Sequence, residues 1–563
     1  MSKALKTQRT RAQESRAAVQ TLYIAMRHLF IRGFYKPLGV SGEAIRDALM
    51  TLRPEIYGEI SDPERVELNG LFYVFQRLPM GIEECRFIKL VSREGLEHTR
   101  FEPIVPNKRR RKSYRIDEEQ IFIEMTRGRS DIYDILTHLT FMYIEAEKIR
   151  TNIMDHDGNT TREWKMLEEI VERETNGEEF NREVAYTYLS TILGRTYQET
   201  VEACKRFQGD SMVDSLFHIT YWLGRKSFLE YTEEQDREIT VSSALRERIG
   251  QHYYGEAWAN NIKQTLHEEG LLTRPIHIIS ANLHSVMNSL YAYAAVPDKP
   301  RIKSLEELAE VLSDDQNETD RQKVEKYARR NGMIQLDDIS GTNISVQIFD
   351  TNKLKIEHLP KEIQFDPAYL TKEQPVLLIM DYAFGEQAYE TMDELLKPYK
   401  ETNLDVKSVS IMGKAGILEG DKGDIMVATA HVFEGTADNY PIENVFKKAD
   451  FEGYGLKVFE GPMVTVLGTS LQNREILSFF LNSSWKAVGL EMEGAHYQKA
   501  IQSASKIRAA VDRDVKLLYA YYASDNPLET GSTLASGSLG VDGVKPTYLI
   551  TTKMLTYILS GAK

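Results

Sequence analysis

Residues 488–495 read VGLEMEGA, and residues 521–527 read YYASDNP. In each stretch, a short apolar segment with the composition of a buried strand is followed at once by acidic side chains. Open α/β sheets bind their ligands at the ends of strands, where the connecting loops meet. We therefore expect the two stretches to deliver carboxylates to one site, and the neighbouring sequence to build a sheet around it.

The surrounding residues alternate between strand-like and helix-like segments. Residues 376–380, VLLIM, form a continuous apolar run that is typical of a strand covered on both faces. A helix is expected at 387–396, and further strands at 406–412, 424–429, 463–467, 487–490 and 516–523. Residues 413–416, GKAG, are expected to form a turn that lets the backbone approach a ligand. The pattern predicts an α/β domain at 371–563, with a mixed, largely parallel sheet and helices on both faces.

The N-terminal part of the chain has a different pattern. From residue 1 to about 300, apolar residues recur with helical spacing, as at 13–34 and 130–154, and no fixed-period repeat is present. We expect a large, mostly α-helical domain there. Residues 301–370 are expected to form a linker with a helix at 304–313 and a small β element at 344–349.

Composition limits the classes of partner. The chain has 563 residues and a formal net charge of −14, so a general surface for nucleic acid or anionic membranes is not expected. No apolar run approaches the roughly twenty residues of a membrane span. The two cysteines, Cys85 and Cys204, are too far apart to indicate a disulfide framework or a structural zinc site. We expect a cytoplasmic protein without a metal or cofactor.

Two polar features of the N-terminal part have more than one interpretation. Residues 108–112, KRRRK, follow prolines and are expected on a loop, where they are either solvated or contact phosphate, an effector or another subunit. His138 and Glu145 lie on one face of a predicted helix, and Lys148 follows Glu145 with ion-pair spacing. A buried or paired histidine is favoured over a metal ligand, because no further ligands are apparent.

Four motifs of the C-terminal domain occur in the order found in a known superfamily. They are the segments 413–416 and 423–427, the pair Met492–Glu493 and the pair Ser524–Asp525. With these motifs, residues 375–560 resemble the nucleoside phosphorylases and nucleosidases, which cleave or phosphorolyse the N-glycosidic bond of nucleosides. Two segments, 413–431 and 524–528, are most similar to the AMP nucleosidase family. The resemblance implies a nucleoside phosphorylase-like fold and a small-molecule purine nucleoside or nucleotide as substrate.

The resemblance also implies roles for individual residues. Cleavage of a ribosyl C–N bond gives the sugar oxocarbenium character and the departing base negative charge. Glu493 is suited to accept hydrogen bonds from the ribose hydroxyls, with Met492 packed against the sugar. Asp525, oriented by Ser524, is suited to protonate the base. The simpler alternatives are a helix-capping Asp525 and a first-turn Glu493 favoured by the helix dipole.

The attacking group separates hydrolases from phosphorylases. Glu386 resembles the water-activating glutamate of methylthioadenosine-type nucleosidases, and the Gly-Asp-Pro-x-Arg turn that phosphorylases commonly have there is absent. Residues 408–412 also contain no arginine, although hexameric phosphorylases often have a phosphate-binding one at this place. Hydrolysis is therefore favoured, with Glu386 as the base. The alternative is that Glu386 is a solvated first-turn residue.

Lys414, next to Gly413, leaves further alternatives open. Its ammonium group could bind the phosphate of a nucleotide, or bind inorganic phosphate in a phosphate-dependent purine nucleoside phosphorylase. It could instead pair with Glu386 or Asp381 and fill the site. The protein would then be a non-enzymatic, nucleotide-binding regulator with a degenerate nucleosidase fold. The loop at 527–540 adds hydroxyl groups that suit a phosphate or a base.

Sites in this superfamily commonly take residues from a neighbouring subunit, so the resemblance implies a homo-oligomer assembled through the C-terminal domain. Light scattering on the purified chain is expected to give a molar mass that is a multiple of 64.6 kDa. A strict monomer at every concentration would contradict this expectation.

Overall fold

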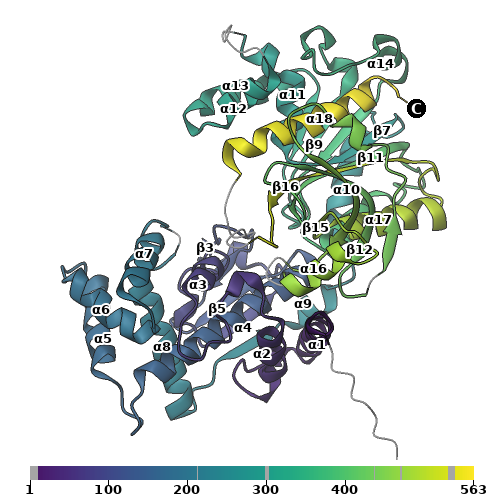
Figure 1. Cartoon of the computed structure of the whole chain (residues 1–563). Helices are drawn as coiled ribbons and strands as arrows, with labels where there is room; N and C mark the ends of the chain where they lie inside the picture. Colours follow the sequence, from purple (N-terminus) through teal and green to yellow (C-terminus); the bar gives the residue numbers. More distant parts are fainter. Residues whose placement is uncertain are drawn as a thin grey trace, which may run out of the picture. The chain divides into compact units, whose positions relative to one another are not determined.

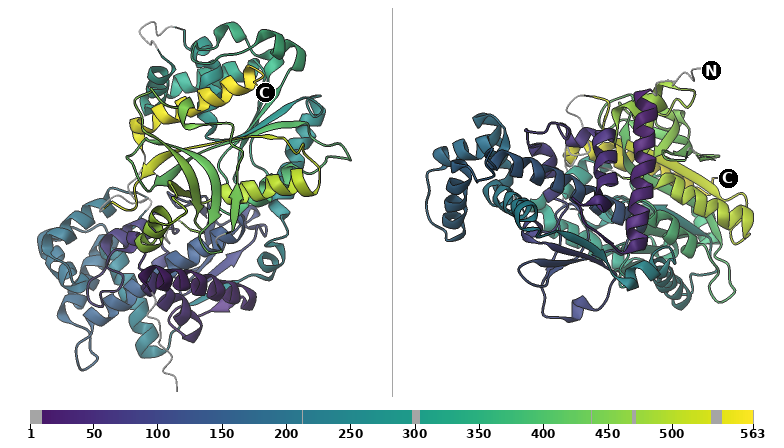
Figure 2. Two further views of the ribbon diagram at one scale, coloured as in Figure 1. Left: turned by 45° about the vertical axis from the view of Figure 1, so that its right-hand side comes forward. Right: turned by 90° about the horizontal axis from the view of Figure 1, so that it is seen from below.

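The computed structural model describes residues 10–211, 213–297, 304–436, 438–468, 472–529 and 539–562 (Figures 1 and 2). The chain forms two compact units. Unit 1 comprises residues 1–251 and 468–476, and unit 2 comprises residues 252–467 and 477–563. Each unit contains a sheet of its own. None of the described helices is both long enough and apolar enough to cross a bilayer.

Unit 1 combines helices with a six-stranded sheet, whereas the sequence pattern predicts helices almost alone. Its helices are α1 (Arg11–Arg32), α2 (Val40–Leu52), α3 (Leu68–Phe75), α4 (Gly128–Ile153), α5 (Arg162–Thr175), α6 (Arg182–Leu193), α7 (Tyr197–Gln208), α8 (Leu216–Glu233) and α9 (Ser243–Arg248). Its strands are β1 (Phe34–Tyr35), β2 (Phe87–Val91), β3 (Pro103–Ile104), β4 (Ser113–Arg115), β5 (Gln120–Glu124) and β6 (Glu238–Val241). They lie in the order β1-β6-β2-β5-β4-β3. The sequence pattern did not reveal this sheet, because its strands are too short to show a clear alternation of apolar and polar residues. In addition, β2 pairs in parallel with strands that are distant in the chain.

The basic run at 108–112 is only partly solvated. Arg109 donates to both carboxylate oxygens of Asp134, at 2.8 and 2.7 Å, and Arg111 donates to Asp131 at 2.8 Å. Both aspartates lie on α4, which is buried along most of its length. Burial alone would raise the pKa of Asp134, but the guanidinium of Arg109 helps to hold it well below its usual range. The solvated-loop interpretation is therefore wrong for Arg109 and Arg111, which neutralise buried charges.

His138 is buried on α4 and paired, as its helical spacing predicts. Its Nδ1 lies 3.0 Å from the hydroxyl of Tyr57, and its Nε2 lies 3.4 Å from Asp134. Burial lowers the pKa of His138 to about 4, so the ring is neutral at neutral pH. Glu145 pairs separately with Lys148 at 2.9 Å. These partners explain the polar face of α4 without a metal.

Unit 2 is an α/β unit. Its strands are β7 (Ile276–Ser280), β8 (Met333–Leu336), β9 (Val346–Asp350), β10 (Val376–Met380), β11 (Val406–Ile417), β12 (Ile425–Phe433), β13 (Asn439–Pro441), β14 (Val458–Thr465), β15 (Gly489–Glu491) and β16 (Lys516–Asp525). Its helices are α10 (Tyr253–Glu268), α11 (Leu283–Ala295), α12 (Leu305–Ser313), α13 (Glu318–Arg330), α14 (Pro367–Glu373), α15 (Gln387–Leu395), α17 (Gly494–Gln502) and α18 (Val544–Leu559). The helix α16 (Arg474–Asn482) begins in unit 1 and ends in unit 2, because the division falls after residue 476.

The division between the units differs from the boundaries predicted at 300 and 370. Residues 252–370 belong to unit 2, because β7 is a central strand of its sheet. β7 pairs in parallel with β10 on one side and with β11 on the other. The expected β element at 344–349 becomes β9, which pairs with β10 rather than bridging two domains. These pairings join segments that are remote in the chain, which periodicity cannot reveal.

Part of the sheet closes on itself. β11 pairs with β15 and β16, β15 pairs with β14, β14 pairs with β12, and β12 returns to β16. Parallel and antiparallel pairs are equally represented among the described strands of unit 2, so the sheet is mixed but not largely parallel. Residues 413–416 belong to β11, and the turn predicted there is wrong.

Helices cover both faces of the sheet, as predicted (Figure 1). Along β10, Leu378 packs in a core that includes residues of α10, α15 and α17. Its neighbours Leu377 and Ile379 pack in a second core that includes residues of α11, α13 and α18. The continuous apolar run of β10 thus reflects a strand buried on two faces.

Asn444 joins two strands of the closed part of the sheet. Its Nδ2 donates to the carbonyls of Ala428 and Tyr519 at 2.9 and 2.8 Å, and its Oδ1 accepts from the N–H groups of Tyr519 and Phe446 at 3.1 and 3.2 Å.

We expect Asn444→Leu to lower the free energy of unfolding by about 2–4 kcal/mol, because buried backbone groups lose their partners. Urea unfolding measures the loss. The exposed Asn482→Ala control should change stability by less than about 0.5 kcal/mol, and equal effects at both positions would refute the role.

Candidate functional site

The carboxyl ends of several parallel strands meet at one edge of the unit 2 sheet. Ser280, the last residue of β7, is in register with Met380 of β10 and Ile411 of β11. β11 continues beyond this level to Gly416, which is in register with Asp525 at the end of β16. The segments that follow β7, β10 and β16 therefore leave the sheet on the same side, where α/β proteins bind ligands.

Glu493 is anchored at this edge by backbone groups. It lies between β15 and α17, is half-buried, and accepts hydrogen bonds from the N–H of Gly385 at 2.9 Å and of Met492 at 3.3 Å. Burial and the neighbouring charge of Glu491 raise the pKa of Glu493 to about 8. The carboxyl group is therefore held in place but binds its proton unusually tightly.

The same hydrogen bond brings the loop after β10 to Glu493. Gly385 has a φ of 56°, a left-handed conformation that favours glycine, and it precedes Glu386 at the start of α15. Glu386 is half-buried. Two of the predicted site residues, Glu386 and Glu493, thus belong to segments in direct contact.

Glu491 supports the turn that carries Glu493. Its carboxylate accepts from the N–H groups of Glu493 and Gly494 and from the hydroxyl of Thr465. It thereby caps the start of α17 and links the turn to β14. Burial raises the pKa of Glu491 to about 7. Met492, between the two glutamates, is 7% exposed.

Asp525 ends β16 beside a β-bulge. The pairing of β16 with β11 passes from Ala523 directly to Asp525 and leaves Ser524 as the extra residue. The Ser524 hydroxyl lies 3.1 Å from the carbonyl of Ala415 and 2.5 Å from Oδ1 of Asp525. Oδ2 of Asp525 is buried and has no hydrogen-bond partner among the described residues. Burial raises the pKa of Asp525 to about 6, against the effects of the Ser524 hydroxyl and the charge of Lys414.

Lys414 and Gly413 lie within β11 rather than on a turn. Gly413 is in register with Tyr521, and a Cβ atom there would meet the Tyr521 ring at 3.6 Å, an ordinary contact. Lys414 is exposed, and its charge acts on Asp525. At Gly416, by contrast, a Cβ atom would lie 2.8 Å from the Leu490 side chain, which would have to shift.

The predicted residues therefore form two groups on either side of β11. Gly416 pairs with both Leu490 of β15 and Asp525 of β16, so the backbones of β15 and β16 lie about 10 Å apart at this level. Glu386, Met492 and Glu493 belong to the first group. Lys414, Ser524 and Asp525 belong to the second. Residues 530–538 of the loop expected to supply hydroxyl groups lie outside the described residues.

Sequence patterns missed the polar residues that support the first group. Tyr497 lies one helical turn after Glu493, and its hydroxyl is 3.0 Å from that of Ser280 on β7. His431 packs so closely against Gly494 that a Cβ atom there would lie 2.2 Å from the ring. The ring also lies 2.9 Å from the Tyr521 hydroxyl, and burial lowers the pKa of His431 to about 3. Helical spacing could have identified Tyr497, but His431 required the strand pairing.

Comparison with known families gives a match over most of the chain. The family described as "Family of unknown function (DUF6909)" matches residues 43–309 and 306–560. The chain belongs to the DUF6909 family. A search of curated proteins finds no match to this DUF6909 chain.

Several solved structures are similar to about half of this DUF6909 chain. Futalosine hydrolase of Helicobacter pylori is 13% identical, with a TM-score of 0.32 over 51% of this chain and 99% of that one. The 5′-methylthioadenosine/S-adenosyl homocysteine nucleosidase of Campylobacter jejuni is 11% identical, with a TM-score of 0.30 over 51% and 98% of the two chains. The S-adenosylhomocysteine nucleosidase of Streptococcus pyogenes is 14% identical, with a TM-score of 0.30 over 51% and 98%. These values are too low to assign an activity.

The raised pKa of Glu493 predicts a pH-dependent stability. A carboxyl group that binds its proton more tightly in the folded state destabilises the protein as pH rises. The loss begins near the pKa of a glutamate in the unfolded chain, about 4. It ends near the pKa of Glu493 in the folded protein, about 8. Glu493→Gln removes this loss. Between pH 5 and pH 9 we expect the variant to gain stability relative to the wild type, on the order of 2 kcal/mol.

Urea unfolding at several pH values measures the gain. The control is Glu419→Gln, whose side chain is exposed, and its difference from the wild type should stay within about 0.5 kcal/mol at every pH. A Glu493→Gln difference that is equally constant would show that the folded protein does not hold this proton more tightly.

Proposed function

We propose that unit 2 hydrolyses the N-glycosidic bond of a purine nucleoside or nucleotide, in the manner of the AMP nucleosidase family that its motifs resemble. The observation that carries the proposal is the hydrogen bond from Gly385 to Glu493. It joins the loop that holds a candidate base, Glu386, to the carboxyl group suited to a ribose. Asp525, a buried acid whose Oδ2 has no hydrogen-bond partner among the residues described, ends a strand at the same edge of the sheet.

Glu493 binds the sugar in this proposal. Ribose hydroxyls donate hydrogen bonds that favour the ionised carboxylate, and an oxocarbenium-like ring favours it further. Because the pKa of Glu493 is raised to about 8 without ligand, substrate binding at neutral pH releases a proton. The ionised group interacts more strongly with the transition state than with the neutral ground state, which is the condition for catalysis.

Asp525 supplies the proton to the base. Its Oδ1 accepts from the Ser524 hydroxyl, and its Oδ2 is buried with no hydrogen-bond partner in the described part of the chain, so Oδ2 is the oxygen from which a proton can be donated. With a pKa of about 6, the acid form becomes scarce as pH rises above this value. A general acid must be protonated to act, so the rate should decline in that range.

Glu386 activates water in the proposed step. It takes a proton from a water molecule as the oxygen bonds to the anomeric carbon of the ribose. The C–N bond breaks with its electron pair moving to the base, which receives the proton of Asp525. The products are the free base and the ribose or ribose phosphate. The contact between the Glu386 loop and Glu493 supports this placement of the water near the sugar.

Lys414 favours a substrate that carries phosphate. Its side chain is exposed and lies close enough to Asp525 for its charge to lower the pKa of that group. A flexible ammonium group at the rim of the site can bind a phosphate as a point charge. The same group could bind inorganic phosphate, which makes the phosphate requirement of the reaction the informative measurement.

The proposal is tested by incubating the purified chain with AMP, adenosine, inosine and methylthioadenosine, each with and without inorganic phosphate. We expect release of free base without phosphate. Asp525→Asn should reduce the rate about 100-fold or more, because it removes the general acid. The wild-type rate should fall as pH rises above about 6, the pKa of Asp525.

The control Asp512→Asn changes an exposed aspartate of the same unit and should keep the wild-type rate. Product formation only with phosphate would identify a phosphorylase instead of a hydrolase. No product from any of the four substrates, with wild type and Asp525→Asn alike, would refute an enzymatic function for these compounds.

A further inference from the structure

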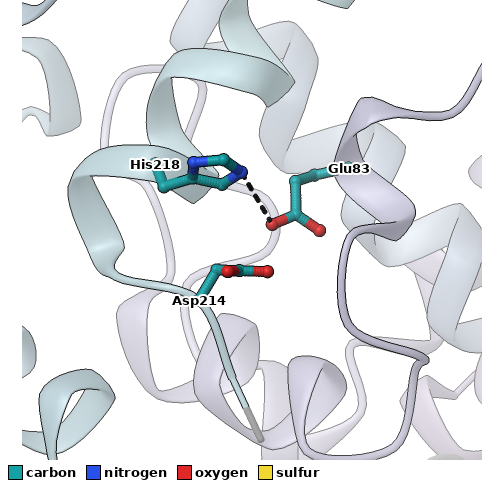
Figure 3. Close-up of side chains that lie close together, drawn as sticks. All are labelled: Glu83, Asp214 and His218. Atoms are coloured by element: carbon teal, nitrogen blue, oxygen red, sulfur yellow. Dashed lines mark ion pairs between the residues drawn. The ribbon is translucent and has the colours of Figure 1, made fainter. Parts of the chain in front are cut away.

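A further cluster of titratable groups belongs to unit 1 and shares no residue with the proposed hydrolysis. It comprises Glu83, Asp214 and His218, each with a donor atom within 4.8 Å of those of the other two. Glu83 belongs to a short 3-10 turn, Ile82–Glu84, while Asp214 precedes α8 and His218 lies in its first turn. Figure 3 shows the three side chains directed toward one another from these segments.

Glu83 is the unusual member of the cluster. It is 2% exposed, and neither of its carboxylate oxygens has a hydrogen-bond partner in the described part of the chain. A buried carboxylate that accepts no hydrogen bond is costly, so a proton or a cation must neutralise it.

Two cationic side chains of unit 1 pair with acids other than Glu83. Arg115 pairs with Glu84 at 2.6 Å, and Lys226 pairs with Glu119 at 2.9 Å. Among the described residues, the only ion pair of Glu83 is with His218, at 3.9 Å.

A similar cluster in unit 2 shows the contrast. It contains His252, Asp393 and Glu394. Arg508 pairs with Asp393 at 2.7 Å, and Lys397 pairs with Glu394 at 2.6 Å. Arg508 and Lys397 already neutralise the acids of the unit 2 cluster, so that cluster needs no external cation.

We propose that Glu83, Asp214 and His218 bind a divalent transition-metal ion of the zinc type. One imidazole and two carboxylates form a donor set that suits such ions, whereas magnesium and calcium prefer oxygen donors alone. A tetrahedral ion with bonds of about 2.0–2.1 Å holds its donors about 3.3 Å apart. The 3.9 Å between His218 Nε2 and Glu83 Oε1 is close to that spacing, so small side-chain movements complete the site.

The surroundings fit an ion that enters from solvent. The side chain of His218 is 20% exposed and Asp214 is half-buried, while Glu83 forms the buried wall. Glu84 Oε1 lies 2.8 Å from His218 Nε2. When the metal replaces the proton at this nitrogen, Glu84 is placed to become the fourth ligand or to bind a coordinated water. Because the carboxyl groups must lose their protons, affinity should fall at acidic pH.

The test uses the full chain, stripped with EDTA and titrated with Zn²⁺ by calorimetry and with Co²⁺ as a visible-absorption probe. We expect one equivalent of either ion to bind, with the intense visible bands of tetrahedral Co²⁺, and the unfolding temperature to rise with Zn²⁺ because the ion binds the folded state. Glu83→Gln and His218→Gln should each weaken binding at least 10-fold. His252→Gln, in the neutralised cluster of unit 2, should bind as the wild type does.

Absence of stoichiometric binding to the wild type would overturn the proposal, whatever the variants do. So would binding that is lost in His252→Gln but kept in Glu83→Gln. If Glu83 is only a protonated acid, Glu83→Gln replaces it with a group of the same shape, and its unfolding temperature will match that of the wild type with and without Zn²⁺. A lower unfolding temperature for the variant only when Zn²⁺ is present supports the metal site, and circular dichroism checks that both variants are folded.

Discussion

The pairing of β11 with its neighbours is the constraint on which unit 2 depends. This strand runs in parallel with β7 and β16 and antiparallel to β15, so it belongs both to the open sheet and to the closed group of strands. Its far end passes between Leu490 and Asp525 through Gly416, where a Cβ atom would lie 2.8 Å from the Leu490 side chain. The residues proposed to bind the sugar and those proposed to protonate the base take their separation from this one strand.

Burial of acidic groups is the common physical theme of both sites. In unit 2, burial raises the pKa of Glu491, Glu493 and Asp525. Glu491 and Glu493 accept hydrogen bonds from backbone N–H groups, which favour the ionised carboxylate and so oppose the effect of burial on the pKa. In unit 1, Asp131 and Asp134 of α4 have arginine partners, whereas Glu83 has no hydrogen-bond partner among the described residues. Acids of this kind mark places where a proton or a cation is exchanged, which is the basis of both proposals.

The local sequence pattern was sufficient to predict features that depend on a single strand or helix. The apolar run of β10 is buried on both faces, the acids of 488–495 and 521–527 do follow strands, and helices cover both sides of the sheet. The pattern failed where pairing partners are remote. β2 and β5 were missed, β7 was separated from its sheet, and 413–416 was taken for a turn although Gly413 pairs with Tyr521.

The sequence by itself determined that the C-terminal part is an α/β unit and that acidic residues come at or just after the ends of two buried strands, because hydrophobic periodicity and strand ends are local properties. Only the tertiary structure decided which segments share a sheet, that Gly385 reaches Glu493, and that Arg109 and Arg111 pair with buried aspartates. It also brought Glu83 to Asp214 and His218. These are contacts between distant segments, and they form only when the whole core packs, so no spacing in the chain records them.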